Sequence, residues 1–341
     1  MPAIRLTDVA TRAGVSLATA SRVLNGSLRS PAEAIAGRVR AAADELGYVA
    51  NAQAQALARS STGLVGVVVH DISDPYFSSI VRGAQHAARM RRSQVLLAST
   101  DRDEQTEVDA VRAFAVYRTD AIILAGSRGS HDDQALTREL ARYTANGGRL
   151  VTFGRTGFPD ARVVEVANAD GAARLVSALV DRGRRRFAVL GGPAELVTVQ
   201  QRVAGFRRAL VVAGLAPLVV EHAEFTSQGG YRSAMLCLDA AGPGTPGADE
   251  PLCLLAVNDV MALGALTAAR ARGLTVPADV EVAGFDDIPT LRDFDPPLTT
   301  FRLPLERMGE RAAELALTGD GSGPVLIEGE VVLRLSAGAP R

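Results

Sequence analysis

The stretch LTDVATRAGVSLATASRVLNG, residues 6–26, decides how this chain is organised. It has the pattern of two short helices joined by a tight turn. Gly14 can take the left-handed backbone angles that a sharp reversal needs, and Ser16 is a good N-cap for the second helix. The apolar residues fall on one face of each helix: Val9, Ala10 and Ala13, then Ala20, Val23 and Leu24. This pattern predicts a helix-turn-helix, whose second helix enters the major groove of DNA.

The outer face of that second helix carries the residues expected to meet DNA. Arg22 is the best candidate for reading a base, because arginine pairs bidentately with guanine O6 and N7, and a phosphate contact is the alternative. Leu17 and Ala18 can touch a thymine methyl group or exclude the wrong base. Contacts to phosphate and sugar are expected from four polar residues, Ser16, Thr19, Ser21 and Asn25.

The rest of the first sixty residues extends this head. A capping box at residues 30–33, with Pro31 at the first helical position, predicts a third helix that stops at Gly47. Residues 51–58, NAQAQALA, form helix only weakly and need support from a partner or from DNA. Residues 1–60 hold seven Arg and four acidic residues, whereas the whole chain has a net charge of −1. A basic head on an acidic body fits a DNA-binding module, although chance segregation of a few charges would look the same.

Beyond Leu64, apolar runs of strand length alternate with amphipathic helices. The expected strands are 64–69, 95–98, 121–124 and 149–153, and then a second series at 163–166, 187–192, 218–221, 253–257 and 280–285. Buried parallel strands joined by crossover helices explain this alternation. The 341 residues therefore predict a head and two doubly wound α/β lobes, with a ligand bound in the cleft between the lobes.

Several other classes of protein are disfavoured. The first residues lack the apolar segment of a secretory signal, and no apolar run approaches the ~20 residues of a membrane span, so a cytoplasmic protein is expected. Cys237 and Cys253 sit among apolar residues and are expected to be buried free thiols. The four histidines are scattered, and the glycine turn at 191–196 is no phosphate-binding loop. No metal, no cofactor and no catalytic triad are expected.

Seven motifs in this order resemble the LacI/GalR family of bacterial transcription regulators. They are DVATRAGVSLATASRVLNG (8–26), ELGYVAN (45–51), DISDPYF (71–77), RVAGF (202–206), AVNDVMALGAL (256–266), GLTVPADVEVAGFDDIP (273–289) and PPLTTFRLP (296–304). The resemblance covers nearly the whole chain. It implies an α/β protein with an all-α helix-turn-helix head and a periplasmic-binding-protein-like body of two doubly wound parallel-sheet lobes.

The resemblance also implies domain boundaries. The head is expected at 1–50, a hinge helix and linker at 51–62, and the effector-binding and dimerisation domain at 63–341. Three strands should link the lobes. The first lobe is expected at about 63–160 plus 295–325 and the second at about 161–294 plus 326–341. One linker is expected near 293–301, so that a final helix near 304–317 returns to the first lobe.

Two sets of site residues follow from the resemblance. In the hinge, Asn51 is expected to contact DNA and Leu57 to wedge into the minor groove, unless Leu57 packs in the dimer instead. Arginine, asparagine and aspartate together suit the vicinal hydroxyls of a sugar, and an aromatic face suits a sugar ring or a purine. One of the two neighbouring aromatic residues, at 76 and 77, could pack inside the protein instead. The expected effector site is Tyr76, Phe77, Ser127, Arg155, Arg202, Phe225, Asn258 and Asp286.

The expectation is therefore a homodimeric repressor that binds a pseudopalindromic operator under the control of a small molecule. A sugar or sugar derivative is the first choice of effector and a nucleoside the second. The alternatives are a regulator controlled by a protein partner, an activator, a solute-binding protein of the transport type, or an enzyme. The last residues, VVLRLSAGAPR, carry no heptad pattern, which predicts a dimer and not a tetramer.

Two departures from the family pattern lie in the head. Arg5 stands where the family has a capping Thr, and Ile35-Ala36 replaces a Thr-Arg pair that contacts phosphate. Modest DNA affinity and a shallow salt dependence are expected, because few phosphates would be neutralised.

Overall fold

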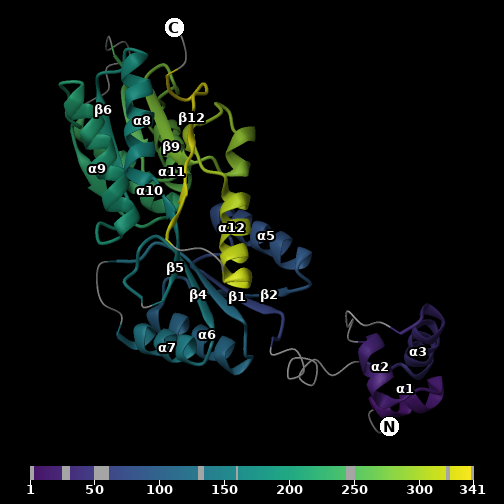
Figure 1. Ribbon diagram of the computed structural model, residues 1–341. Coiled ribbons are helices and arrows are strands. Elements are labelled where there is room, and N and C mark those ends of the chain that lie inside the picture. Colours follow the sequence, from purple (N-terminus) through teal and green to yellow (C-terminus); the bar gives the residue numbers. More distant parts are fainter. Residues whose placement is uncertain are drawn as a thin grey trace. The chain divides into compact units, whose positions relative to one another are not determined.

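The structure, a computed structural model, describes residues 4–24, 31–49, 61–129, 134–158, 160–242, 250–319 and 323–338. The chain divides into two compact units, residues 1–63 and 64–341, which we call the head and the body. Where the structure describes it, the head is helical, and the body contains two sheets (Figure 1). The expected residues Asn25, Asn51 and Leu57 lie outside the described residues.

The head contains α1 (Leu6–Ala13), α2 (Leu17–Leu24) and α3 (Glu33–Leu46). Gly14 is left-handed, with φ 64°, and the Ser16 hydroxyl accepts from the Thr19 N–H at 3.1 Å. The predicted turn and N-cap are confirmed. The hydrophobic core of the head is a cluster of small buried residues: Val9, Ala10, Ala13, Ala20, Val39, Ala42 and Ala43.

The predicted start of the third helix is wrong. Glu33 is the first residue of α3 and Ala32 its N-cap. At that position Glu33 cannot reach back to close a capping box, and its carboxylate pairs with Arg40 at 2.8 Å instead. The predicted stop is confirmed, because Gly47 ends α3 in the left-handed conformation.

The first sheet of the body is parallel throughout, in the order β11-β5-β4-β3-β1-β2. Its strands are β1 (Leu64–Val69), β2 (Gln94–Ser99), β3 (Ala121–Ala125), β4 (Arg149–Phe153), β5 (Arg162–Val166) and β11 (Val325–Ile327). Its helices are α5 (Pro75–Met90), α6 (Glu104–Val116), α7 (Gln134–Ala145) and α12 (Leu305–Thr318). The pair α5 and α12 packs together, as does the pair α6 and α7.

Alternate residues of the central strands serve the two faces of this sheet. Val67, Ile123 and Val151 belong to the core that includes α5 and α12. Val68, Ile122 and Leu150 belong to a separate core with α6 and α7. A strand covered on both faces is apolar at every position, which is why runs such as LVGVVV predict a parallel sheet.

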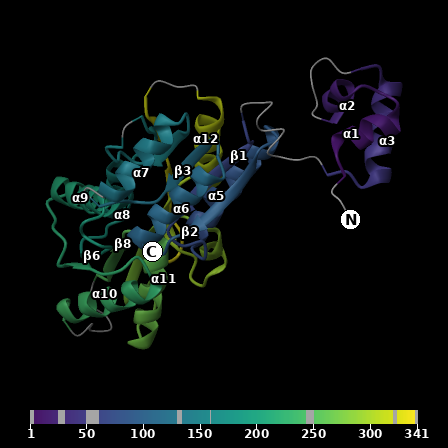
Figure 2. The ribbon, with the colours of Figure 1, turned by 90° about the horizontal axis from the view of Figure 1, so that it is seen from below.

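The second sheet has the order β12-β10-β9-β8-β6-β7 and is parallel except for the β10–β12 pair. Its strands are β6 (Phe187–Gly191), β7 (Val220–His222), β8 (Leu252–Ala256), β9 (Val280–Asp286), β10 (Thr299–Arg302) and β12 (Glu330–Val332). Its helices are α8 (Asn168–Asp181), α9 (Val197–Val212), α10 (Ser227–Ala240) and α11 (Asp259–Ala271), with a 3-10 turn η1 (Pro289–Asp293). Figure 2 gives a second view of both lobes.

The chain crosses between the lobes a few residues from the expected places. β5 pairs with β4, so the first crossing follows Val166 and not residue 160. β10 pairs with β9, so the return follows Arg302 and does not lie at 293–301. The third crossing joins β11 to β12 at residues 327–330. The final helix packs on α5 in the first lobe, as the resemblance implied.

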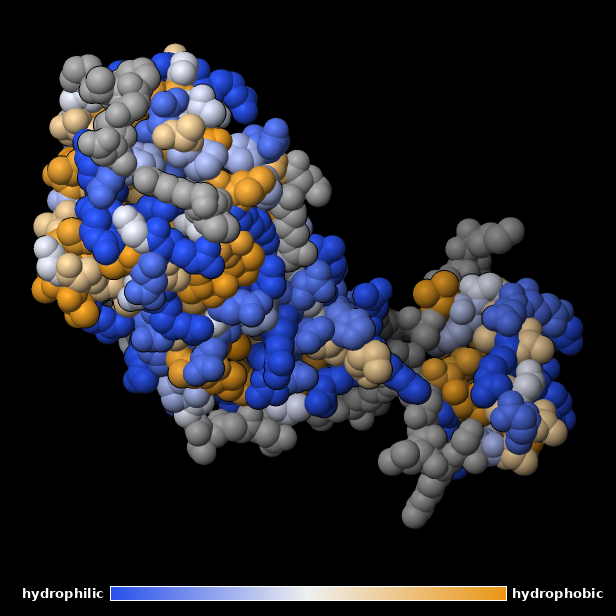
Figure 3. Space-filling model, turned by 90° about the horizontal axis from the view of Figure 1, so that it is seen from above, coloured by the Kyte–Doolittle hydropathy of each residue, from blue (hydrophilic) through white to orange (hydrophobic). Residues whose placement is uncertain are grey.

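Both cysteines are buried free thiols, as predicted. Among the described residues, no helix is long and apolar enough to cross a membrane. On the face drawn in Figure 3, hydrophilic side chains are interspersed with smaller hydrophobic areas.

Candidate functional site

The outer face of α2 is exposed in the head. Leu17 keeps 49% of its surface, and Ser16, Ala18 and Arg22 are also exposed. Thr19 and Ser21 are half-buried. Ala20 is fully buried against the other helices, so the helix presents a fixed face. The residues expected to read DNA therefore share one accessible surface.

The two departures from the family pattern have structural counterparts. Arginine has no acceptor for an N-cap, and the cap interaction at α1 comes from Asp8, whose carboxylate accepts from the Arg5 N–H at 2.8 Å. Ala36 is fully buried in the head and can offer nothing to a phosphate.

A pocket lies between the two lobes of the body, in a space of about 990 Å³ that includes open solvent. Its walls come from segments that follow the carboxyl ends of strands in both sheets, the usual ligand position in this architecture. All eight residues expected at the effector site line it. The other lining residues are Asp74, Arg102, Gly126, Arg128, Phe153, Gly154, Thr156, Glu165, Val166, Asn168, Val197, Thr198 and Gln201.

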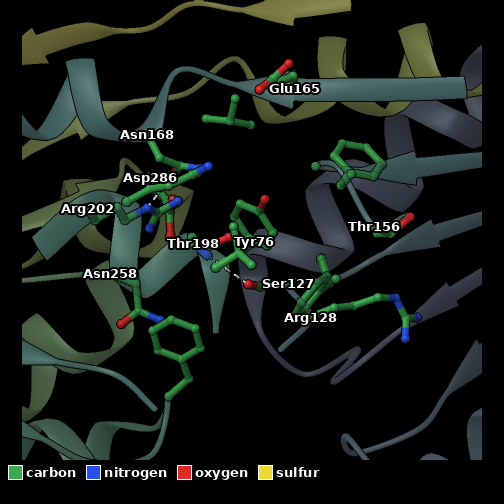
Figure 4. Close-up of a pocket in the computed structure, with 18 of the residues that line it drawn as sticks. Tyr76, Ser127, Arg128, Thr156, Glu165, Asn168, Thr198, Arg202, Asn258 and Asp286 are labelled. Atoms are coloured by element: carbon green, nitrogen blue, oxygen red, sulfur yellow. Dashed lines mark hydrogen bonds and ion pairs between the residues drawn. The ribbon is translucent and has the colours of Figure 1, made fainter. Parts of the chain in front are cut away.

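Arg202 of α9 is the centre of a buried network in the second lobe (Figure 4). Its Nη2 donates to Asp286 Oδ1 at 2.9 Å, its Nε to Asn168 Oδ1 at 2.9 Å, and its Nη1 to the Val257 carbonyl at 2.6 Å. The guanidinium also lies over the Phe285 ring, 3.9 Å from the centroid. These contacts fix the orientation of the guanidinium at the edge of the pocket.

Asn258 has a divided role. It is the N-cap of α11, because its Oδ1 accepts from the Met261 N–H at 2.9 Å. The oxygen is therefore used by the helix, and the NH2 group is the part that can serve a ligand. The neighbouring Asp259, the first residue of α11, does not cap the helix, because its carboxylate accepts from the Ile288 N–H and the Thr300 hydroxyl.

Burial governs the charge of the aspartates in this region. Burial raises the pKa of Asp286 to about 8 despite the neighbouring Arg202, and the nearby Asp259 adds to the rise. Burial likewise raises the pKa of Asp259 to about 6. Asp287 has a structural position, with Arg302 and Arg334 each at 2.7 Å. The protonation state of Asp286 can thus decide whether Oδ2, the oxygen that does not accept from Arg202, donates or accepts a hydrogen bond.

The aromatic residues divide between packing and lining. Phe77 is 5% exposed and packs edge-on against His70 and Tyr76. Tyr76 lies between the polar side chains of the second lobe, such as Arg202 and Asn258, and those of the first lobe, such as Arg128 and Thr156 (Figure 4). Phe225 forms a wall from the second lobe, and Arg102 of the first lobe lies 5.2 Å from its ring centroid.

The first lobe contributes two arginines that are paired with carboxylates. Arg128 pairs with the buried Glu107, and Arg155 pairs with Glu165 at 3.2 Å. Ser127 lines the pocket, but its hydroxyl already accepts from the Thr198 N–H at 3.3 Å. Within the described residues no group of three His, Cys, Asp or Glu side chains could hold a metal ion.

Comparisons with known proteins agree with this architecture. Residues 5–51 match the bacterial regulatory proteins of the lacI family, and residues 176–336 match the periplasmic binding protein-like domain. The HTH-type transcriptional regulator GalS of Salmonella typhimurium is 36% identical over 321 residues, which cover 93% of this chain and 90% of GalS. This chain belongs to the LacI family of bacterial transcriptional regulators.

Two solved structures of such regulators resemble the whole chain. The complex of the transcriptional regulator CelR with cellobiose matches with a TM-score of 0.70 and 30% identity, covering 98% of this chain and all of CelR. The Lac repressor dimer bound to operator and the anti-inducer ONPF matches with a TM-score of 0.81 and 27% identity, covering 98% and 99%. The helix-turn-helix head and the two-lobed α/β body of this regulator are thus the family architecture.

Several residues of this regulator's pocket are not among those expected from the sequence. Asn168 begins α8 just after β5 of the first sheet, and this position is the signal that could have found it. Thr198 is the second residue of α9, several residues after β6 of the second sheet, and carries no such signal. Asn168 is not among the expected residues because the strand before it, β5, was expected in the second lobe. That expectation placed the first crossing near residue 160, away from the pocket.

Proposed function

We propose that this chain is a transcriptional repressor whose affinity for operator DNA is set by a small molecule bound between the two lobes. The observation that carries the proposal is the presence, in one chain, of an exposed helix-turn-helix face and an interlobe pocket with a polar network around Arg202. Binding that favours one arrangement of the lobes would shift the population that can hold the operator.

We infer that the effector is a sugar or sugar derivative. Asn258 offers an NH2 donor, Asp286 offers a carboxyl oxygen, and Phe225 and Tyr76 offer ring faces to an apolar sugar surface. The cellobiose bound by CelR, a relative over the whole chain, supports this class. A nucleoside would use the same ring faces for its base and is the second candidate.

We further propose a homodimer that acts in the cytoplasm, where its DNA lies, and that has no enzymatic activity. The dimer places two heads on the two halves of a pseudopalindromic site. The Lac repressor dimer on its operator supports this arrangement. Light scattering of the full chain should give twice the chain mass of 35.6 kDa.

The direct test begins with selection of DNA fragments by the purified full chain, followed by fluorescence anisotropy on the selected duplex. A thermal-shift screen with neutral monosaccharides, disaccharides and nucleosides then identifies the effector. The proposal predicts a selected duplex with two-fold symmetry and a ligand that changes its affinity. Selection of no sequence, or turnover of a sugar without DNA binding, would contradict the proposal.

A further inference from the structure

The start of α9 is completed by the opposite lobe. A helix leaves its first N–H groups without partners inside the helix, and a side chain at the N-cap usually accepts from one of them. The N-cap of α9 is Leu196, which has no acceptor in its side chain. The Val197 N–H donates to the Arg128 carbonyl at 3.0 Å, and the Thr198 N–H donates to the Ser127 hydroxyl at 3.3 Å.

The loop that supplies these acceptors follows β3 of the first lobe. Gly129 also forms an isolated antiparallel bridge with Leu196, so residues 127–129 run beside the start of α9. Figure 4 shows the Ser127–Thr198 bond at the pocket wall. Two hydrogen bonds, one of them part of the bridge, thus join the lobes away from the covalent crossings, and both are made by groups of the protein itself.

The first lobe holds this loop firmly. The His70 ring, buried under Gly126, lies with Nε2 3.1 Å from the Ser127 carbonyl. Arg128 pairs with Glu107, whose side chain is 8% exposed. A loop anchored at both residues can act on α9 as part of the first lobe, because it does not move independently of it.

We propose that Ser127–Gly129 is an interlobe clasp that caps α9 across the cleft and holds the body closed without a ligand. Because α9 also carries Arg202, the clasp and the effector network share one helix. Opening the cleft would leave two helix N–H groups without acceptors until water replaced them. The step from lobe closure to effector response rests on the proposed function, whereas closure itself does not.

Two substitutions should remove the two hydrogen bonds of the clasp without changing the rest of the fold. Ser127→Ala deletes the hydroxyl acceptor. Val197→Pro deletes the other N–H at the first position of the helix, where proline is well tolerated. Leu196 has φ −76° and ψ 127°, the extended conformation that a residue before proline prefers. Thr226→Ala is the matched control, because the Thr226 hydroxyl caps α10 within one lobe by the same kind of bond, at 2.9 Å.

The measurement is the spin-label distance between Ala113→Cys in α6 and Ala271→Cys in α11, in the full chain without added ligand. Both alanines are exposed, whereas Cys237 and Cys253 are buried and should not be labelled. The Ser127→Ala/Val197→Pro variant should lower the closed-to-open ratio by about tenfold, since each lost hydrogen bond is worth a few-fold in population. A changed distance distribution is therefore expected in this variant and an unchanged one in Thr226→Ala.

Hydrogen exchange gives a second readout on the same proteins. The amides at the start of α9 should exchange faster in the double variant, and those at the start of α10 only in the control. An unchanged distance distribution in the double variant would overturn the proposal, as would an equal change in both variants. The experiment involves neither DNA nor effector, so its failure would leave the proposed function standing.

Discussion

At the scale of single residues, the pocket depends on groups whose atoms have different partners. The Oδ1 of Asn258 caps a helix while its NH2 group can serve a ligand. Each of the three side-chain nitrogens of Arg202 donates to a protein acceptor, which fixes the geometry of the guanidinium beside Asp286. Sequence motifs predicted that these residues meet at one site. They could not predict which atom is already used, because that depends on side-chain geometry.

The buried carboxyl of Asp286 predicts a pH dependence of stability. The usual aspartate pKa is about 3.9, and the folded protein raises that of Asp286 to about 8. Between these two pH values the folded state therefore binds more protons than the unfolded state. The contribution of Asp286 to the free energy of unfolding is complete at low pH and is lost as the pH rises to about 8. Between pH 6 and 8 the loss should be about 1 kcal/mol per pH unit, measured by urea unfolding.

Asp286→Asn should flatten this decline, because the amide cannot ionise. Asp259→Asn is the control, since the pKa of Asp259 is raised only to about 6 and its effect should end near that pH. The same slope between pH 6 and 8 in Asp286→Asn and in the parent would contradict the assignment.

Arg22 gives the sharpest residue-scale prediction in the head. Its side chain is exposed beside Ala18 on the outer face of α2. If Arg22 reads a guanine, Arg22→Ala should weaken binding to the selected duplex by about 10- to 100-fold and relax the base preference at one position of each half-site. A uniform loss on all sequences, with the salt slope reduced by about one, would assign it to a phosphate instead.

At the scale of elements, the long buried strands and the amphipathic helices were predictable, and three of the short strands were not. Runs such as AIILA and LCLLA are apolar at every position because helices cover both faces. β10, β11 and β12 have three or four residues each and were not expected. Such short strands lack a periodic signal and form because the crossings bring them beside longer strands.

The close packing of α5 on α12 predicts that a methyl group added at a glycine between them lowers the free energy of unfolding. A Cβ on Gly83 would lie 1.8 Å from the Glu306 carbonyl oxygen, and one on Gly309 would lie 1.9 Å from that of Ile80. Gly83→Ala should push the helices apart and lower the free energy of unfolding by about 1–3 kcal/mol in urea titrations.

Gly37→Ala in α3 is the matched control for that substitution. Gly37 is also helical, but nothing lies within 4 Å of its added Cβ. This change should stabilise the head by about 0.5–1 kcal/mol through helix propensity. A neutral Gly83→Ala would contradict the close backbone packing of α5 and α12.

At the scale of the whole molecule, a helix-turn-helix head is joined to a two-lobed body whose cleft is the proposed site for a small molecule. The motif order predicted both parts and the doubly wound lobes. It misplaced two crossings, because an apolar strand carries no mark of the sheet to which it belongs. The crossing after Val166 leads directly to Asn168, which holds Arg202, so the effector network begins where the lobes are joined.

By the proposed function, a small molecule in the interlobe cleft sets the affinity of this regulator for operator DNA. The most direct test is the operator affinity of the full chain with and without the ligand found by screening, in the parent and in Asn258→Asp. That variant keeps an oxygen to cap α11 and loses the NH2 donor of the pocket. Both proteins should bind the operator alike without ligand, and only the parent should respond to the ligand at the same concentration. Equal responses of parent and variant, or a ligand that binds the cleft without changing operator affinity, would contradict it.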